Sequence, residues 1–179
     1  GRTPDNCRDR RTFRELQPKA SIIYKFPNNT GSIFLNYGRG FKSGGFNPIG
    51  TRATLLVGLP NILVQDAYDA ETADSYEAGF KSQLFNNVVS LNGSVFYTEA
   101  RNTQQFEFFP TGGIQAISQI KKNRIYGAEF DVQIRPTRNL TLFGGFGYID
   151  TKITDIDSQD PADRAAIIGN KIPFAAKYN

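Results

Sequence analysis

The sequence predicts an all-β fold built from long antiparallel strands, and three observations support this prediction. Aromatic residues make up 13% of the 179 residues, with 15 Phe and 8 Tyr, and such residues are enriched in strands. Apolar and polar side chains alternate over long stretches, which places them on opposite faces of a strand. Short turns alternate with long connections along the chain. We count six strands and expect a seventh to begin near Lys171.

Three short turns join the strands in pairs. They are PNNTG at 27–31, NN at 86–87 and PTRN at 136–139. Each contains Pro, Asn or Gly, which preset or tolerate the dihedral angles of turns. Strand-like alternation flanks each turn on both sides, so each turn predicts a β-hairpin. Between the hairpins we expect long irregular connections, which span residues 42–71, about 101–122 and about 153–171.

The strands that flank these turns each have one apolar and one polar face. The stretch RIYGAEFDVQIR at 124–135 is the clearest example. Its apolar positions are Tyr126, Ala128, Phe130, Val132 and Ile134, and its polar positions include Glu129, Asp131, Gln133 and Arg135. In a soluble sheet the apolar face forms the core, whereas in a membrane barrel it faces lipid and the polar face lines the interior. The alternation alone does not choose between them.

Three further features favour the membrane barrel. The predicted strands run about 10 to 14 residues, against about five or six in typical globular proteins and about 9 to 11 for a strand that crosses a membrane. Long loops at one rim and short turns at the other are typical of outer-membrane barrels. Tyrosines on the apolar face also reach a similar level away from the turns, as in an aromatic girdle. They are Tyr37, Tyr76, Tyr97, Tyr126 and Tyr148. We therefore predict part of an antiparallel transmembrane β-barrel.

The alternation assigns side chains to the two sides of the barrel wall. Those expected to face lipid are Ile33, Leu35, Phe80, Val89, Leu91, Phe130, Val132, Leu142 and Phe146. Those expected to face the lumen are Glu77, Lys81, Asn92, Ser94, Glu129, Asp131 and Gln133. Glu129 and Asp131 share a face, and a carboxylate pair is able to do acid–base chemistry. Because no pocket or substrate motif accompanies them, we interpret them as polar wall, hydrogen-bonded to Arg135 and to strand neighbours.

The composition argues against several classes of function. The net charge is +4, and no Lys/Arg cluster lies in a recognisable nucleic-acid-binding module. Histidine is absent and Cys7 is the single cysteine, which removes His-dependent catalysis, Cys-based zinc sites and an intrachain disulfide. We therefore predict no catalytic, cofactor or metal residues, no enzyme activity and no nucleic-acid partner. The longest uncharged apolar run, residues 53–65, is too short for a transmembrane helix and contains Pro60.

Two motifs resemble ligand loops but depart from them in detail. GRGFKSGG at 38–45 lacks the Gly that a phosphate-binding loop places before its Lys, so we interpret it as a strand end that enters a loop. DIDSQDPADRAA at 155–166 begins with calcium-loop spacing but ends in Ala166, where a calcium loop needs Glu. For this segment we predict a short helical turn that Asp160 caps, with Pro161 at its first position.

Three separated blocks resemble the C-terminal barrel of TonB-dependent outer-membrane receptors. They are LNYGRGFKSGGFNP (35–48), ETADSYEAGFKSQLFNNVVSLNGSVFYTEA (71–100) and NRIYGAEFDVQIRPTRNLTLFGGFGYIDTKITD (123–155). The blocks occur in order, and the resemblance covers nearly the whole chain. It implies a barrel of about 22 strands with a plug domain inside. It also implies energised uptake of ferric siderophores, haem, cobalamin or glycans, driven by the TonB complex of the inner membrane.

The chain departs from this family pattern because it contains no plug domain, no TonB box and only about seven of the expected strands. We therefore expect residues 1–179 to be an internal fragment of the barrel, in contact with the lipid of a Gram-negative outer membrane. Ferric siderophore is the ligand we favour, although other nutrients fit equally well. Arg39, Lys42 and Arg52 are the residues expected to attract an anionic chelate. The alternatives are a passive porin-like channel and a soluble β-rich binding or adhesion domain.

Overall fold

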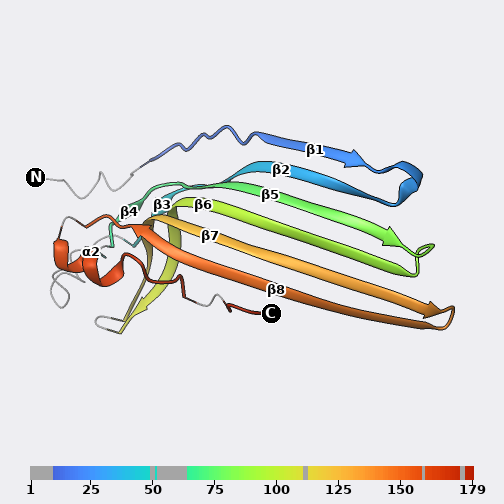
Figure 1. The fold of residues 1–179 in the computed structure, drawn as a ribbon. Coiled ribbons are helices and arrows are strands. Elements are labelled where there is room, and N and C mark those ends of the chain that lie inside the picture. The colour runs from blue at the N-terminus through green and yellow to red at the C-terminus, as the bar shows by residue number, and fades with distance from the viewer. Residues whose placement is uncertain (1–9, 49–50, 52–63, 111–112, 159, 174–175) are drawn as a thin grey trace, which may run out of the picture.

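A computed structural model describes residues 10–48, 51, 64–110, 113–158, 160–173 and 176–179 of the chain. One antiparallel sheet of six strands dominates it (Figure 1). In spatial order the strands are β1 (Lys19–Lys25), β2 (Gly31–Lys42), β5 (Glu71–Leu84), β6 (Val89–Phe109), β7 (Ile114–Thr137) and β8 (Leu140–Asp155). The smaller elements are η2 (Pro27–Asn29), β3 (Gly45–Phe46), β4 (Ala67–Tyr68) and α2 (Pro161–Ile167). The predicted all-β, antiparallel class is confirmed.

The three predicted hairpins are all present, and they join β1 to β2, β5 to β6 and β7 to β8. Asn28 and Asn29 adopt left-handed backbone angles, with φ of 58° and 57°. Asn86 and Asn87 do the same, with φ of 54° and 67°. Asparagine tolerates this region better than most residues, so the Asn pairs that suggested the first two turns also form them. All three turns lie at one end of the sheet (Figure 1).

The strand register confirms that the predicted polar and apolar residues lie on opposite faces. On one face Lys81 pairs with Asn92, and Asn92 pairs with Asp131. On the other, Leu91 pairs with Val132. Since directly paired residues of an antiparallel sheet point to the same side, each face is continuous from strand to strand. We call the side that carries Leu91 the outer face and the other side the inner face.

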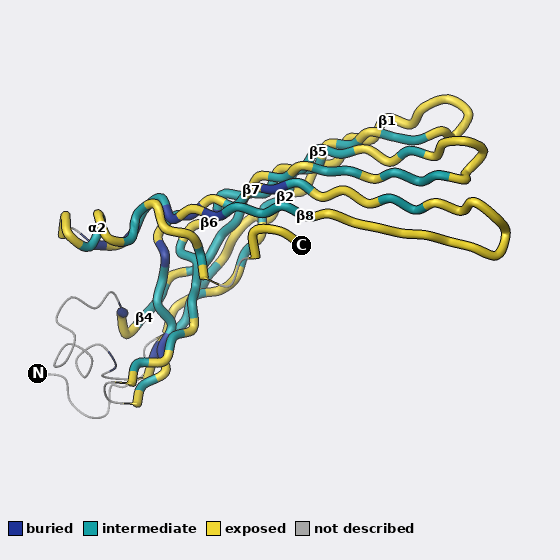
Figure 2. The backbone as a smooth tube through the Cα atoms, turned by 60° about the horizontal axis from the view of Figure 1, so that its bottom comes forward, coloured by how far each residue is buried: buried dark blue, intermediate teal, exposed yellow. Residues whose placement is uncertain are grey.

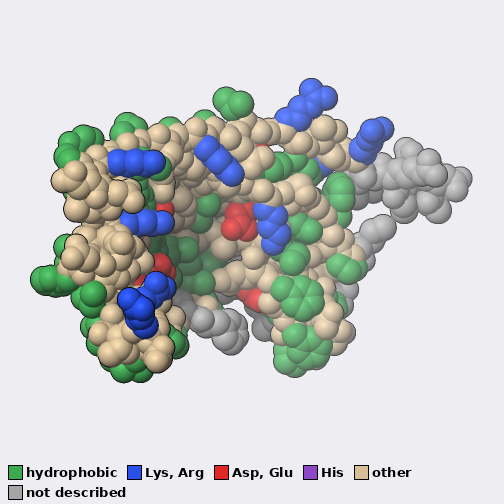
Figure 3. Space-filling view, turned by 90° about the vertical axis from the view of Figure 1, so that its right-hand side faces the viewer, with side chains coloured by type: hydrophobic (Ala, Val, Ile, Leu, Met, Phe, Trp, Pro, Cys, Tyr) green, Lys and Arg blue, Asp and Glu red, His purple; other side chains and the backbone are tan. Residues whose placement is uncertain are grey.

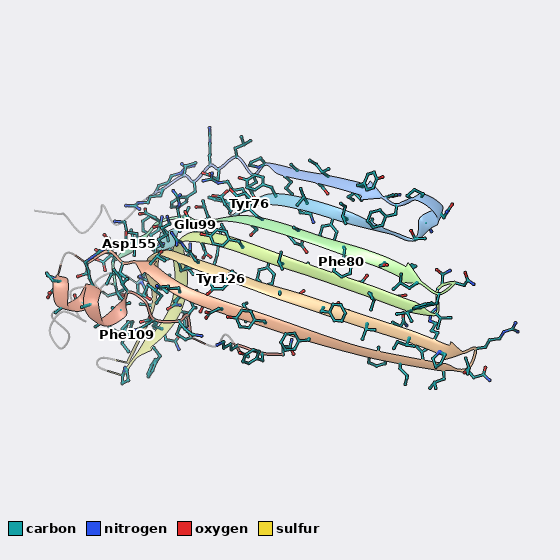
Figure 4. The ribbon with its side chains drawn as sticks, in the orientation of Figure 1. Tyr76, Phe80, Glu99, Phe109, Tyr126 and Asp155 are labelled. Atoms are coloured by element: carbon teal, nitrogen blue, oxygen red, sulfur yellow. The ribbon has the colours of Figure 1, made fainter. Side chains whose placement is uncertain are left out.

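The five tyrosines on the apolar face form a row across the sheet, which we call the tyrosine belt. Tyr37 pairs with Tyr76, Tyr76 with Tyr97, and Tyr97 with Tyr126. Tyr148 pairs with Ala128, so it lies two residues nearer the short turns than the pairing level of Tyr126. Tyr76 and Tyr126 lie at a similar level along the strands, and Phe80 lies closer to the turns (Figure 4). The predicted alignment of the tyrosines is confirmed.

The sheet is a single curved layer whose outer face no other part of the described chain covers. On that face Leu35, Val95 and Phe146 are 57%, 57% and 53% exposed. Viewed from the short-turn end, hydrophobic side chains line the outer margin of the arc and acidic side chains lie within its hollow (Figure 3). An apolar surface of this size in contact with water is unfavourable. Lipid is the environment that suits it.

The buried residues gather at the end of the sheet away from the short turns (Figure 2). One cluster contains Ile120, Ile153 and Ile156, and the other contains Val64 and Ala116. The long arms of the sheet near the turns contain exposed and half-buried residues instead. The compact part of the described chain is therefore the part that holds the long connections.

One predicted loop is wrong, because residues 101–109 and 114–122 continue β6 and β7 as a hairpin. The ladder passes from Arg101–Lys122 to Thr103–Ile120 without a change of register and omits Asn102 and Lys121, and the φ of Asn102 is 53°. Such an irregularity bends a strand pair, and the hairpin turns away from the main sheet beyond it (Figure 1).

The predicted capped helix is found, whereas the described residues near Lys171 form no strand and the C-terminal residues pair with β8 only at an isolated bridge between Tyr148 and Tyr178. The Asp160 side chain accepts a hydrogen bond from Ala162 N at 2.9 Å and Pro161 begins α2, as predicted. Asn179 exchanges two backbone hydrogen bonds of 3.0 Å with Gly147, and this pairing extends back to Lys177. Residues 177–179 therefore pair with the free edge of β8, six residues later than the strand start expected from the sequence. Within the described residues, no helix is long and apolar enough to cross a membrane.

Candidate functional site

The polar inner face is the surface best suited to a function, because four strands bring its side chains together. Its members are Asn36 on β2, Glu77 and Lys81 on β5, Asn92 and Ser94 on β6, and Glu129, Asp131 and Gln133 on β7. Asn36 links the strands: it accepts a 2.7 Å hydrogen bond from Ser21 and donates a 3.0 Å bond to Glu77. All seven predicted lumen residues belong to this surface.

Two of the hollows along this face adjoin both Glu129 and Asp131. The larger has a volume of about 520 Å³, and its lining includes Asn36, Lys81 and Asp131. The second, of about 340 Å³, lies against β8, where Gly145 and Gly147 carry no side chain. The glycines of β8 therefore leave room in front of the two carboxylates.

Glu129 and Asp131 make no side-chain hydrogen bond to another described residue, so the bond to Arg135 expected from the sequence is not seen. Their cross-strand partners on β6 are Ser94 and Asn92. Two carboxylates beside an open hollow can bind water, cations or polar groups. Among the described residues, no group of three or more metal-binding side chains is placed to hold an ion.

The residues expected to attract an anionic ligand occupy different positions. Arg39 lies on the outer face, paired with Glu15 at 2.9 Å and, more loosely, with Asp74 at 4.0 Å. Lys42 is the last residue of β2 and pairs in register with Glu71 on the inner face. Arg52 lies outside the described residues. Lys42 is thus better placed than Arg39 to meet a solute inside the barrel, and the ligand-binding role stays a prediction.

A row of charged residues lies on the outer face directly beyond the tyrosine belt, and the sequence analysis missed it. Tyr37 Oη donates to Asp74 Oδ1 at 2.8 Å, and Tyr126 Oη donates to Asp150 Oδ2 at 2.9 Å. The tyrosine rings thus lie on apolar surface while their hydroxyls reach a charged one, as expected at a membrane–water interface. The same period-two alternation, followed past each tyrosine, would have found these charges.

The connections at the far end are held by specific polar contacts. The buried Asn47 side chain donates to Gln65 O at 2.7 Å and to Ile117 O at 2.9 Å, and accepts from Ile117 N at 2.7 Å. These bonds join Asn47 to Gln65 and to the β6–β7 hairpin. Gln104 and Gln119 add further bonds, both donating to Asp69 O.

Asp155 anchors α2 to the end of β8 (Figure 4). Arg164 Nη2 donates to Asp155 Oδ1 at 2.8 Å, and Lys121 Nζ lies 3.7 Å from Oδ2. The hydrogen bond from Arg164 is the main reason that the pKa of Asp155 lies below its ordinary value of 3.8, and Lys121 contributes to the same shift. This segment lies beyond the tyrosine belt, outside the apolar band.

A family model described as TonB dependent receptor-like, beta-barrel, matches residues 2–179. This chain belongs to the TonB-dependent receptor family. The family consists of transporters of the Gram-negative outer membrane, so the apolar outer face of this TonB-dependent receptor segment faces outer-membrane lipid.

Curated relatives are similar over most of the chain. The probable TonB-dependent siderophore receptor PiuA of Acinetobacter baumannii is 24% identical over 163 residues, which cover 89% of this chain and 21% of PiuA. The metal-pseudopaline receptor CntO of Pseudomonas aeruginosa is 24% identical over 144 residues, 80% of this chain and 18% of CntO. The TonB-dependent receptor segment therefore spans about a fifth of the length of these relatives.

Solved structures agree on the fold. The ferric yersiniabactin uptake receptor FyuA of Yersinia pestis superposes with a TM-score of 0.60 at 21% identity, over 90% of this chain and 21% of that one. The PiuA structure from Acinetobacter baumannii gives a TM-score of 0.60 at 23% identity, over 89% and 22% of the two chains. The six-strand sheet of this TonB-dependent receptor is thus an arc of the barrel wall seen in these receptors.

Proposed function

We propose that this chain forms one section of the barrel wall in an outer-membrane receptor that imports a scarce nutrient by TonB-dependent active transport. The observation that carries the proposal is the two-sided sheet. From β2 to β7 the strands present mainly apolar side chains to lipid and mainly polar side chains to the interior, where Phe34 and Phe96 are exceptions. Such a wall seals against the bilayer and also offers polar contacts to whatever fills or crosses the lumen.

We propose a ferric siderophore as the nutrient. This is the kind of ligand that the names of PiuA and FyuA state for those proteins. Lys42, and more weakly Arg39, would add positive potential near the far end of β2, where an anionic chelate arrives. Arg52 belongs to the same proposal.

We propose further that the plug and the TonB contact lie in other parts of a longer protein. The curated relatives are about five times as long as the matched segment, which supports this view. Glu129 and Asp131 would then meet polar or cationic groups of the segment that fills the lumen. The wall would act by positioning and sealing, without covalent chemistry, so we expect no enzyme activity from it.

The test is uptake of a radiolabelled ferric siderophore by a strain that lacks the parent gene and by the same strain with the full-length gene restored. We expect uptake only in the restored strain, and we expect a TonB deletion or a protonophore to stop it. A passive porin-like channel would continue to admit small solutes under both treatments. Restored, TonB-dependent uptake of a different nutrient would contradict the siderophore assignment alone.

A further inference from the structure

Two exposed cations, Arg124 on β7 and Lys152 on β8, lie directly opposite each other beyond the tyrosine belt. They are partners in the β7–β8 register, so their side chains share a face. Arg124 lies two residues before Tyr126 on the same strand, which places it on the outer face about 6–7 Å further from the short turns. Both residues are exposed.

The carboxylates next to this pair are engaged with other cations. Glu99, the β6 partner of Arg124, lies 3.0 Å from Lys122 Nζ and 2.9 Å from Arg101 Nη2. Within the described chain, neither Arg124 nor Lys152 makes an ion pair or a side-chain hydrogen bond.

Asp150 is the other nearby carboxylate, and it is also occupied. Lys171 Nζ lies 2.8 Å from its Oδ1, and Tyr126 Oη donates to its Oδ2 at 2.9 Å. Arg101 and Lys122 pair with Glu99, and Lys171 pairs with Asp150. Among the described residues, Arg124 and Lys152 are therefore the two cations of this group that have no carboxylate partner.

Like charges that face each other across two strands destabilise a sheet unless an anion lies between them. Phosphate suits this position, because guanidinium and ammonium groups both form charge-assisted hydrogen bonds to its oxygens. The pair also lies at the correct depth. Tyrosine rings mark the boundary of the hydrocarbon region, so the next residues outward on the lipid side meet the headgroups.

We propose that Arg124 and Lys152 together bind a phosphate group on the headgroup of an outer-leaflet lipid. A single lipid molecule can lay its acyl chains on the apolar outer face near Phe146 and Tyr148 and place its phosphate between the two cations. The same chemistry would bind free phosphate, but the position on the lipid side, one step beyond the tyrosine belt, favours the lipid. The site lies on the opposite face from the lumen and is independent of the transported ligand.

The experiment measures lipid retention by the full-length receptor in nanodiscs, using native mass spectrometry. The probes are a phosphorylated glycolipid, the same glycolipid without its phosphates, and inorganic phosphate. The variant is Arg124→Gln/Lys152→Gln. The matched control is Arg135→Gln/Arg138→Gln, which removes two cations at the short-turn end of the same hairpin.

We expect the site variant to bind the phosphorylated glycolipid at least about tenfold more weakly than wild type, since each surface cation contributes about fivefold to binding of an anionic lipid. The control should stay within about twofold. Wild type should bind the dephosphorylated glycolipid as weakly as the site variant does. Each single substitution should weaken binding about fivefold, and these singles serve as the test should the double variant fail to fold.

Equal retention by the site variant and the control would overturn the proposal. Binding of inorganic phosphate to wild type without preference for the phosphorylated glycolipid would also overturn it, because the lipid would then not be the source of the phosphate. Uptake of the nutrient by the same variants separates this proposal from the transport function, since we expect uptake to continue in the site variant.

Discussion

Tyr126 Oη donates a hydrogen bond to Asp150 Oδ2 at 2.9 Å, across the β7–β8 pair. The same relationship joins Tyr37 on β2 to Asp74 on β5 at 2.8 Å, on the same outer face but towards the opposite edge of the sheet. In both cases an aromatic ring ends the apolar band and a carboxylate begins the charged surface. Tyrosine and aspartate side chains from neighbouring strands therefore mark the boundary between lipid and water on the outer face.

The first prediction concerns the apolar band. Leu91 lies on the outer face six residues from Tyr97 along β6. This is about 20 Å along a tilted strand, near the middle of a band about 25 Å tall. We expect Leu91→Arg to lower the free energy of unfolding by about 2–4 kcal/mol, measured by denaturant unfolding of the full-length receptor in lipid vesicles.

The matched control for this substitution is Ser94→Arg, on the same strand but on the inner face. Its new side chain would lie beside Glu129, the cross-strand partner of Ser94, and should cost little. Equal losses at the two positions would contradict the assignment of the two faces.

The second prediction concerns Gly127 on β7. A Cβ atom there would meet the Tyr148 carbonyl oxygen, and it would lie 2.6 Å from Cζ of Phe96, whose ring covers this glycine. We expect Gly127→Ala to destabilise the barrel by about 1–3 kcal/mol, because the surrounding backbone has to shift. Gly144→Ala is the control, since its Cβ would make an ordinary contact of 3.7 Å with Val132. Thermal unfolding of both variants provides the comparison, and a control that loses as much stability would argue against the steric explanation.

The third prediction concerns the buried Asn47. Replacing it with Ala removes three hydrogen bonds and leaves Ile117 N and O without their partner. Each unsatisfied buried group costs about 1–3 kcal/mol, so the β6–β7 hairpin should open locally. Hydrogen exchange at Ile117 should accelerate in Asn47→Ala, whereas Gln105→Ala on the same hairpin should leave it unchanged. Unaltered exchange in Asn47→Ala would show that the hairpin is held by other contacts.

The fourth prediction concerns pH. The pKa of Asp155 lies below its ordinary value of 3.8 because of the hydrogen bond from Arg164. A carboxylate with a lowered folded-state pKa contributes stability that is present above the unfolded pKa and is lost as the pH falls towards the folded value. Attachment of α2 should therefore persist at neutral pH and weaken below about pH 4. Hydrogen exchange of α2 amides against pH measures this, and Asp155→Asn should remove that part of the pH dependence.

The fifth prediction concerns Lys42. If the positive charge at the end of β2 attracts an anionic chelate, Lys42→Gln in the full-length receptor should weaken ligand binding about two- to fivefold, and added salt should reduce the difference. Arg138→Gln at the opposite rim is the charge-matched control. Identical binding curves for both variants would exclude Lys42 from ligand attraction.

Local patterns were sufficient to predict the sheet itself. The asparagine pairs at 28–29 and 86–87 predicted two of the turns, and period-two alternation predicted both faces and the tyrosine belt. These features depend on neighbours in sequence, on turn dihedral angles and on the pleat of a strand, which a single sequence contains. Asp160 as a helix cap was predictable for the same reason.

The features that were not predictable depend on contacts between distant segments. The ladder is interrupted at Asn102, whose φ is positive, and the sequence beyond it was read as a loop although β6 and β7 stay paired there. Asn47 meets Ile117, a residue 70 positions away, and nothing near either residue in the sequence indicates that contact. Arg39 looked available for a ligand because its pairing with Glu15 and Asp74 requires the folded sheet.

The row of tyrosines also constrains how the strands can be assembled. A register shift of one residue would move the apolar side chains of a strand to the polar inner face and its polar side chains into lipid, which is strongly unfavourable. Sliding the strand by two residues keeps every side chain on its correct side and only displaces its tyrosine by about 6–7 Å from its neighbours. The direct pairing of Tyr76 with Tyr97 therefore helps to fix the strand register. It distinguishes the native register from one shifted by two residues, which the alternation of polar and apolar side chains alone would allow.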